Sequence, residues 1–550
     1  MATVTEPKPN PESADLPVLD YWKSLVPESP PVRGIELLAV SLLVALCDLT
    51  IYRGRGFAGY GLLFVLAPIL LGIGSPSVQR CRTGWLIVAL LWALAARLVW
   101  CGSALAVCCG FAGVVAFAMT LVNRTPFVMA VLAFAGQTVA SGARGLNHYG
   151  CSAHRDLRPL KHSSAMSVMM PLAAFGLFGS LFVLANPDLV SSISHRFERW
   201  LAIINEWLIH FSLIEIAFWV ATAWFVVGLL RPTTAEPAVG PLAPSAALET
   251  PSGGAEAKST GPAPLYSAYR NTLLTVISLF AAYLVFEFQS LWFREFPKGF
   301  HYSGYAHEGA AWLTFALGLA TVMLSLIFRG DVLNDERLPK LKRLAWIWSA
   351  LNLLLAMAVY HRLCIYIGFN GMTRMRMVGF YGMTAVVVGF GLAVWKIARQ
   401  RDFVWLFRAD LWALAAAFYL YALTPVDLIV MRYNVSRILT GDPAPSVQIS
   451  VHPIDAEGVR ELFPLMECRD EIIREGVNAL LARRESEMAA EDQRTGRVFS
   501  NWEQLTAIQF AEEALLRELN SDRDRMQPYS GPVKREEAWE RFQKYAYQWY

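Results

Sequence analysis

Charged residues are scarce in this chain, and their scarcity indicates its class. Of the 550 residues only 17% are charged while 55% are hydrophobic, and the mean hydropathy is +0.38. A soluble globular protein carries about a quarter charged residues. The composition therefore predicts an integral membrane protein rather than a string of soluble domains.

Other signals are missing as well. The net charge is only +3, and no basic stripe is interleaved with aromatics, so we expect no nucleic-acid partner. Most of the eight cysteines lie in apolar runs, where thiols behave as small hydrophobes, and no disulfide framework is implied. No phosphate-binding loop, Ser-His-Asp order, Rossmann glycine pattern or H-E-x-x-H helix occurs. We therefore predict no catalytic residue, no metal and no cofactor.

Residues 1–32 are rich in proline and acidic residues. They lack the basic start and short apolar region of a cleavable signal. We expect a disordered segment here, followed by a first span that stays in the mature protein.

Apolar runs predict about twelve membrane-spanning helices in an all-α polytopic bundle, because a span needs ~20 mostly apolar residues. The runs are 33–52, 56–74, 83–99, 102–122, 126–143, 165–187, 208–230, 270–292, 309–329, 343–367, 377–398 and 405–430.

Residues 231–268 are rich in proline, alanine and glycine, and such a segment cannot bury enough apolar surface to order itself. This linker separates a first membrane half (33–230, seven spans) from a second (269–432, five spans). Residues 433–550 have charges between apolar positions at helical spacing. They predict a small soluble helical region with Trp502, Trp539 and Trp549 as anchors of its core.

Lysine and arginine accumulate in short cytoplasmic loops. The loops after spans 1, 5, 7, 9 and 11 hold about twice as many as the loops after spans 2, 4, 6, 8 and 10. We therefore expect the first set, with Arg53 and Arg55, in the cytoplasm, and the C-terminal region outside it. Arg432 and Arg437 argue mildly against this orientation.

Three polar clusters share the predicted outer side. They occupy 302–309 before the ninth span, 366–377 between the tenth and eleventh, and 427–434 where the last span ends. Their carboxylates and fork-shaped arginines could form one rim. The candidate binding residues are Tyr305, His307, Glu308, Asn370, Thr373, Arg374, Arg376, Asp427, Arg432, Tyr433 and Asn434.

The rim has two structural interpretations besides a functional one. Paired arginines and carboxylates are tolerated at a partly dry interface, and arginines at helix ends often snorkel to the membrane surface. The functional interpretation is a site for an anionic group, such as a lipid phosphate, a glycan acid or a small anion.

These clusters resemble landmarks of the bacterial membrane family catalogued as domain of unknown function 4173. The similar stretches are Y-A-H-E-G at 305–309, Y-I-G-F-N-G-M-T-R-M-R at 366–376, R-Y-N at 432–434 and the acidic D-A-E at 455–457. His307 takes a basic place in the first and Met372 a leucine place in the second. The resemblance covers roughly 165–470. It implies a bacterial multi-pass membrane protein and implies no reaction.

A possible metal cluster lies within residues 148–162, where His148, Cys151, His154 and His162 crowd one short loop. Zinc accepts imidazole and thiolate. However, Arg155 and Arg158 stand among these residues, so we favour a basic, solvated cytoplasmic loop over a metal site.

Several ionisable residues fall inside predicted spans, where they usually face the bundle interior and can mark ion routes. They are Asp48, Arg97, His210, Glu215, Glu287, His361 and Asp410. We favour structural pairs, with Glu36, Asp48 and Arg97 pairing within the first half. Their number keeps a transporter possible.

The leading hypothesis is a non-enzymatic protein of a bacterial inner membrane, acting as an envelope scaffold or signalling partner. Its partners would be the lipid bilayer and another envelope protein, or an anionic lipid or glycan group. One alternative is a transporter, in which Glu287, His361 and Asp410 would face a common polar cavity. The other is a membrane transferase for lipid-linked substrates, with Glu308, Arg374, Arg376 and Arg432 in a pocket open to the outer leaflet.

Overall fold

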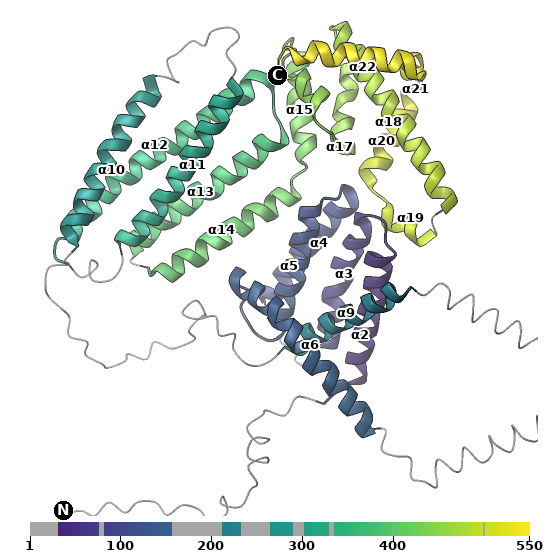
Figure 1. Cartoon of the computed structure of the whole chain (residues 1–550), viewed down its shortest axis with the longest axis horizontal. Helices are drawn as coiled ribbons and strands as arrows, with labels where there is room; N and C mark the ends of the chain where they lie inside the picture. The colour runs from purple at the N-terminus through teal and green to yellow at the C-terminus, as the bar shows by residue number, and fades with distance from the viewer. Residues whose placement is uncertain are drawn as a thin grey trace, which may run out of the picture.

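The computed structural model describes residues 31–75, 82–156, 212–232, 265–289, 302–328, 335–399, 401–498 and 501–549. Side chains of 151–156, 302–310, 325, 491–498 and 501 lie outside this description. Every regular element in the described ranges is a helix, which confirms the all-α class. Figure 1 shows two groups of membrane helices and a third group of shorter helices.

The first membrane bundle contains α2 (Gly34–Cys47), extended by the π-turn η2 (Asp48–Tyr52), α3 (Phe57–Gly74), α4 (Arg82–Trp100), α5 (Ala104–Leu121), α6 (Val128–Asp156) and α9 (Leu213–Leu230). Its core includes the buried side chains of Phe64, Leu91 and Leu98. Small residues let these helices approach closely. A Cβ on Gly110 of α5 would lie only 1.9 Å from the Phe64 ring of α3.

The second membrane bundle contains α10 (Tyr266–Glu287), α11 (Tyr302–Ile327), α12 (Leu338–Asn370), α13 (Arg374–Arg399) and α14 (Phe403–Leu423). Its core packs around Trp348, Leu273 and Leu324. Within the membrane, α14 joins the two bundles, because the Tyr419 hydroxyl donates to the Leu90 carbonyl of α4 at 2.8 Å.

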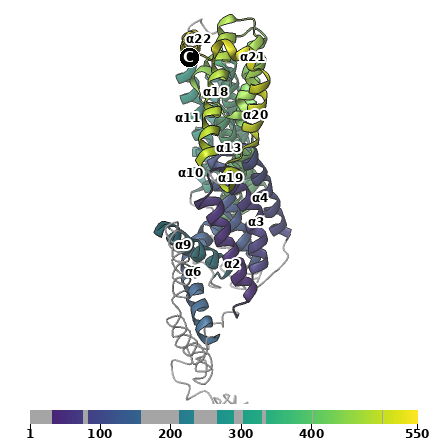
Figure 2. The same ribbon diagram turned by 90° about the vertical axis from the view of Figure 1, so that its right-hand side faces the viewer.

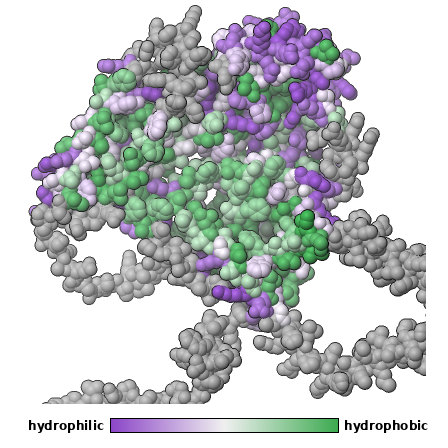
Figure 3. Space-filling model, in the orientation of Figure 1, coloured by the Kyte–Doolittle hydropathy of each residue, from purple (hydrophilic) through white to green (hydrophobic). Residues whose placement is uncertain are grey.

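Nine described helices are long and apolar enough to span a membrane: α2 with η2, α3, α4, α5, α9, α10, α12, α13 and α14. Figure 3 shows hydrophobic residues gathered over both bundles and hydrophilic residues over the third group. The protein is therefore a multi-pass membrane protein. The described residues do not confirm twelve spans, since 165–187 lies outside them and the described side chains of α11 give an apolar stretch, Ala311–Leu324, that is shorter than a span.

The expected span at 126–143 is part of α6, which does not qualify as a span. Phe127, just before α6, lies under Arg408 near the start of α14. Tyr149, near its other end, donates to Glu36 at the start of α2. Both ends of α6 therefore lie at the same end of the bundle, and Figure 1 shows α6 running obliquely there.

The last predicted span, 405–430, is interrupted. Helix α14 ends at Leu423, and α15 (Val426–Leu439) begins after Pro425. Proline lacks a backbone N–H and disfavours helical geometry in the preceding residue, here Thr424. Asp427 is therefore the second residue of a new helix rather than the end of a span.

The third group, residues 426–549, is called the C-terminal domain here. After α15 it contains α16 (Ser446–Val451), α17 (Ala456–Val459), η5 (Arg460–Glu467), α18 (Glu471–Val498), α19 (Asn501–Ala507), α20 (Phe510–Ser521), α21 (Arg523–Met526), η6 (Gln527–Tyr529) and α22 (Pro532–Tyr547). Figure 2 shows most of it at one end of the molecule, away from α2 and α6.

Val477, Leu515 and Phe542 are fully buried in the core of this domain. Two of the expected anchors, Trp539 and Trp549, pack against that core. The third expected anchor, Trp502, contacts the first bundle instead, where its indole donates to the Leu49 carbonyl at 2.7 Å.

We call the membrane face covered by the C-terminal domain the domain face and the opposite one the far face. The loop after α2 lies on the domain face, because Arg55 pairs with Glu503. The loop after α4 lies there too, since the Gly102 amide donates to Gln509. The expectation that Arg53 and Arg55 lie opposite the C-terminal region is wrong. That expectation counted 126–143 as a membrane crossing. Without this crossing, each earlier loop lies on the opposite side of the membrane from the one expected.

Cysteine labelling tests this arrangement. Arg55→Cys and Val533→Cys should react with a membrane-impermeant maleimide from the same side, and Arg399→Cys from the other side, all in a background free of native cysteine. All three wild-type positions are exposed. Labelling of position 55 together with position 399 would contradict the arrangement.

Candidate functional site

The turn between α12 and α13 depends on Gly371 and on two asparagines, Asn370 and Asn434. Gly371 has φ +98°, a left-handed conformation that favours glycine. A Cβ there would also lie 2.5 Å from the Asn434 side-chain oxygen. Asn434, from α15, accepts from the Met372 amide at 2.6 Å and donates to its carbonyl at 2.9 Å. This clamp attaches the turn to the C-terminal domain.

Arg376 points into the same turn and is only 5% exposed. It donates to the Asn370 side chain at 2.5 Å and to the Gly371 carbonyl. Its guanidinium stacks 3.7 Å from the centre of the Tyr366 ring. The guanidinium is therefore held by neutral groups and by an aromatic face.

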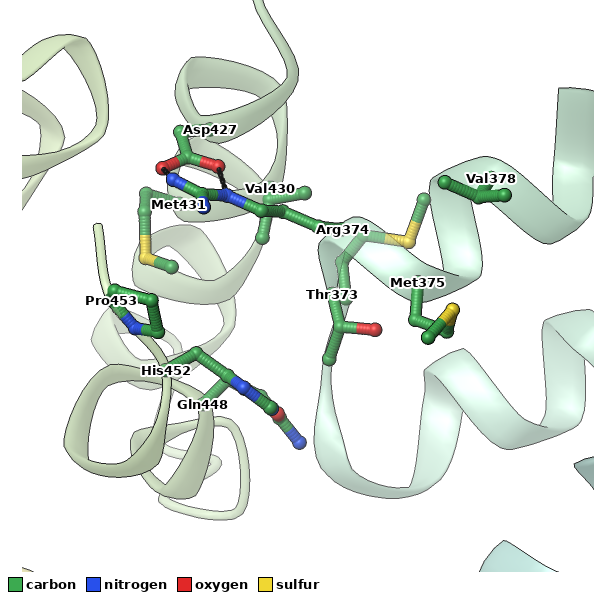
Figure 4. Close-up of a pocket in the computed structure, with 11 residues that line it drawn as sticks. Thr373, Arg374, Met375, Val378, Asp427, Val430, Met431, Gln448, His452 and Pro453 are labelled. Carbon is green, nitrogen blue, oxygen red and sulfur yellow. Dashed lines mark hydrogen bonds and ion pairs between the residues drawn. The ribbon is translucent and has the colours of Figure 1, made fainter. Parts of the chain in front are cut away.

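Arg374, two residues earlier, points toward α15 (Figure 4). Its guanidinium binds Asp427 with both arms of its fork and Asp455 at 2.7 Å. The Asp427 carboxylate is only 2% exposed and also accepts the Asp455 amide at 2.7 Å. Burial and the neighbouring Asp427 raise the pKa of Asp455 above its ordinary value.

Two residues further along, Glu457 binds the first bundle. The Arg97 guanidinium, near the end of α4, donates to its two carboxylate oxygens at 2.9 and 2.6 Å. The side chains are only 13% and 1% exposed, respectively. Asp455 and Glu457 thus bind cations of different bundles. We call Asp455-Ala456-Glu457, with Arg374 and Arg97, the two-bundle tie.

Further contacts hold the C-terminal domain on the first bundle. Gln509 accepts from the Gly102 amide at 2.6 Å and donates to the Leu98 carbonyl at 3.1 Å. The Thr506 hydroxyl accepts from the Arg55 amide at 3.2 Å. These bonds cap backbone groups at helix ends that would otherwise lack partners.

A cavity of about 310 Å³ opens beside Arg374. Its polar lining is Thr373, Arg374, Asp427, Gln448 and His452, and its apolar lining is Met372, Met375, Val378, Val430, Met431 and Pro453. Figure 4 shows the labelled residues converging from α13 and the turn before it, from α15, and from α16 and the segment after it. Burial and the nearby Arg376 and Arg374 lower the pKa of His452, so its imidazole is neutral at pH 7.

The predicted rim residues therefore divide into groups. Thr373, Arg374 and Asp427 line the cavity, whereas Asn370, Arg376 and Asn434 build the turn. Arg432 pairs with Glu461 on the exposed surface, and Tyr433 is 38% exposed beside Arg437. The side chains of Tyr305, His307 and Glu308 lie outside the described residues, so their place beside the arginines stays a prediction.

Sequence reasoning missed several important residues. Gln448 and His452 lie in the cavity, and Arg97 pairs with the C-terminal domain rather than with Glu36 or Asp48. Glu36 instead binds Arg231 at 2.5 Å. Asp48 contacts Arg53 at 3.1 Å and accepts from the Trp219 indole. The sequence singled out the acidic D-A-E stretch, Arg374 and Arg97 separately, but nothing in it paired them.

The intramembrane carboxylates occupy separate interfaces. Glu287 of α10 binds Arg362 of α12 and accepts from the Tyr283 hydroxyl at 2.8 Å. Asp410 of α14 lies against Gly389 of α13. His210 lies outside the described residues. Glu287 and Asp410 therefore do not share one interface.

The histidine-rich loop gives no metal site among the described residues, where no group of three potential ligands occurs. His148 lies 3.3 Å from Arg231, an unfavourable neighbour for a cation. The side chains of Cys151 and His154 and the whole of His162 fall outside the description.

Comparison with known proteins gives one match. A family model described as domain of unknown function (DUF4153) matches residues 66–457. The resemblance to domain of unknown function 4173 is therefore wrong, because the family whose model matches is a different one. No curated protein and no solved structure matches the chain.

Removing the Glu457 carboxylate of the two-bundle tie should destabilise the protein. Glu457→Gln leaves Arg97 without its ionic partner in a nearly buried place, which costs about 3–5 kcal/mol. We expect a clearly lower midpoint of thermal unfolding, followed by circular dichroism in detergent. The matched control is Glu461→Gln. Its partner Arg432 is exposed to water, so breaking this ion pair should lower the free energy of unfolding only slightly.

The double variant Arg97→Met with Glu457→Leu removes both charges and should recover most of the stability, because an apolar pair of similar size often replaces a buried ion pair. Equal midpoints for Glu457→Gln and Glu461→Gln would show that the tie contributes nothing.

Asp455 and Asp427 should respond differently to neutralisation. The raised pKa of Asp455 means that the folded state binds its proton more tightly than the unfolded state, so this group lowers stability as pH rises through that pKa. Asp455→Asn should therefore keep or slightly raise the unfolding midpoint at pH 7. Asp427→Asn should lose about 1.5–3 kcal/mol, because it weakens charged hydrogen bonds to Arg374.

Unfolding midpoints measured between pH 4 and pH 8 check both statements. The difference between the wild type and Asp455→Asn should shrink as pH falls, because the wild-type carboxyl becomes protonated. A loss for Asp455→Asn at pH 7 as large as that for Asp427→Asn would refute this assignment.

Proposed function

The chain belongs to the family described as domain of unknown function DUF4153, and on that premise we propose that it is a non-enzymatic membrane scaffold. Its two membrane bundles hold the C-terminal domain in a fixed position on one membrane face, where it docks another protein. The observation that carries this proposal is the two-bundle tie. One tripeptide of the domain binds α13 through Asp455 and α4 through Glu457.

The state of the charged residues supports a structural rather than a catalytic role. Acid–base catalysis needs a group that can exchange a proton with a substrate. The Arg374 guanidinium already binds two carboxylates, and Arg376 is enclosed by its own turn. Arg432 points to a different surface. The transferase hypothesis needed these three arginines in one pocket, so it has less support.

The transporter hypothesis also has less support. It needed Glu287, His361 and Asp410 around a common polar cavity. Glu287 of α10 is fully buried and engaged by Arg362 of α12, whereas Asp410 of α14 lies against Gly389 of α13. A paired carboxylate of this kind stabilises helix packing.

We place the protein in a bacterial inner membrane with the C-terminal domain outside the cytoplasm. Basic residues support this orientation, since they accumulate on the cytoplasmic side. The far face carries Arg231, Arg337, Lys340, Lys342, Arg343, Lys396, Arg399 and Arg401, whereas short loops on the domain face carry Arg53, Arg55, Arg374 and Arg376. In intact cells, the cysteines at 55 and 533 should therefore react from outside.

The partner proposed is a protein rather than an anionic lipid or glycan. Arg374, the one arginine or lysine among the residues that line the cavity, already binds Asp427 and Asp455, which disfavours an anion there. Helix α22 exposes Val533 and Tyr547, at 72% and 63%, on the outer surface of the domain. Aromatic and apolar side chains of this kind anchor protein interfaces.

Photocrosslinking in cells tests the scaffold. A photoreactive amino acid at Val533 or Tyr547 of the full-length protein should give a discrete protein adduct. The control position is Leu353 of α12, which is 55% exposed within a membrane span and should give none. Absence of any discrete adduct from both domain positions would overturn the proposal.

A further inference from the structure

The cavity beside Arg374 lies where the membrane ends. Arg374 is the first residue of the spanning helix α13, and Asp427 follows the end of α14 by four residues. Val378, also in the lining, lies one turn deeper, which is about 6 Å along a helix. The cavity therefore extends from the polar boundary of the bilayer into its apolar part.

The apolar wall continues onto the outer surface of α13. Met375 and Val378 line the cavity and are also 66% and 47% exposed, on a helix that spans the membrane. Exposed side chains on a membrane-spanning helix are in contact with lipid. At the inner end of the same wall, Val430 and Met431 are only 1% and 3% exposed. A lipid chain can thus pass from the bilayer to a buried place along these apolar residues, beside the Arg374 side chain that reaches across to Asp427 (Figure 4).

The lining suits a flexible apolar chain. Three of its six apolar residues are methionines, whose unbranched, polarisable side chains adapt to irregular shapes. The volume of about 310 Å³ lies at the small end of the range for ligand sites. The polar residues Thr373, Gln448 and His452 lie at the outer end, where the glycerol esters of a membrane lipid would be.

Charge decides between headgroups. The charged lining residues are Arg374 and Asp427, which bind each other, and Asp455 binds the same guanidinium from just outside the lining. An anionic headgroup would compete with two carboxylates for Arg374, whereas the half-exposed Asp455 carboxylate can take a further cation.

We propose that this cavity binds one acyl chain of a zwitterionic phospholipid with an amine headgroup, the chain between α13 and α15 and the amine near Asp455. The site is independent of the proposed scaffold role, because it requires only that α13 spans the membrane. It places a specific lipid at the junction of the second bundle and the C-terminal domain.

A photoactivatable lipid tests the site. The full-length protein is reconstituted in phosphatidylcholine vesicles with a trace of phosphatidylethanolamine carrying a diazirine on its acyl chain, and crosslinked residues are mapped by mass spectrometry. The buried Met431 should be labelled. Labelling confined to exposed side chains such as Met375 of α13 and Met357 of α12 would show ordinary surrounding lipid and would overturn the site.

Two comparisons sharpen the test. Met375→Trp narrows the mouth of the cavity and should lower Met431 labelling roughly tenfold, or about 1.4 kcal/mol. Val388→Trp, 45% exposed elsewhere on α13, should leave it unchanged. Both positions are exposed, so the fold should tolerate them. A phosphatidylglycerol probe that labels Met431 as strongly as the phosphatidylethanolamine probe would overturn the headgroup assignment.

Discussion

The position of the C-terminal domain depends on two carboxylates one residue apart in the chain. Asp455 binds Arg374 of the second bundle, and Glu457 binds Arg97 of the first. Water is largely excluded from the Arg97–Glu457 pair, so each of its charges needs its partner to remain in place. Asp455 is half exposed, and its contribution is to direct the segment onto Arg374. Around them, Asn434 fixes the α12–α13 turn and Gln509 caps the end of α4. The domain is therefore oriented by both bundles at once.

Much of the membrane architecture could be predicted from apolar runs. Nine of the twelve predicted runs correspond to described helices that can span a bilayer. The failure at 126–143 has a physical cause. After residue 136 that segment contains Gln137 and Ser141, and Arg144 follows it directly. The helix packs across the end of the bundle instead of through it. A single false crossing was sufficient to misplace the first loop. Pro425 was visible in the sequence, but the apolar run on both sides of it concealed the helix break.

The candidate site was predicted only where the partners are close in the sequence or share a recognisable cluster. Arg374 and Asp427 were both selected, because each stands at the end of an apolar run on the same expected side. Arg97 and Glu457 are 360 residues apart, and hydropathy carries no information on which buried cation meets which carboxylate. Arg376 and Arg432 lie close in the sequence to Arg374 and Asp427, respectively. The Arg376 side chain is buried in its turn, whereas the Arg432 side chain is exposed. Side-chain direction at a helix end depends on packing that composition does not describe.

The arrangement of the tie has a mechanical consequence. Apart from contacts along α14, the described parts of the two bundles are joined through a domain that grips each by an ion pair, and these pairs originate from one rigid tripeptide. Lateral tension that thins the bilayer and spreads its helices would pull Arg97 and Arg374 in opposite directions. The tripeptide has too little length to follow both, so it resists such stretching together with the neighbouring bonds of Gln509, Thr506 and Asn434.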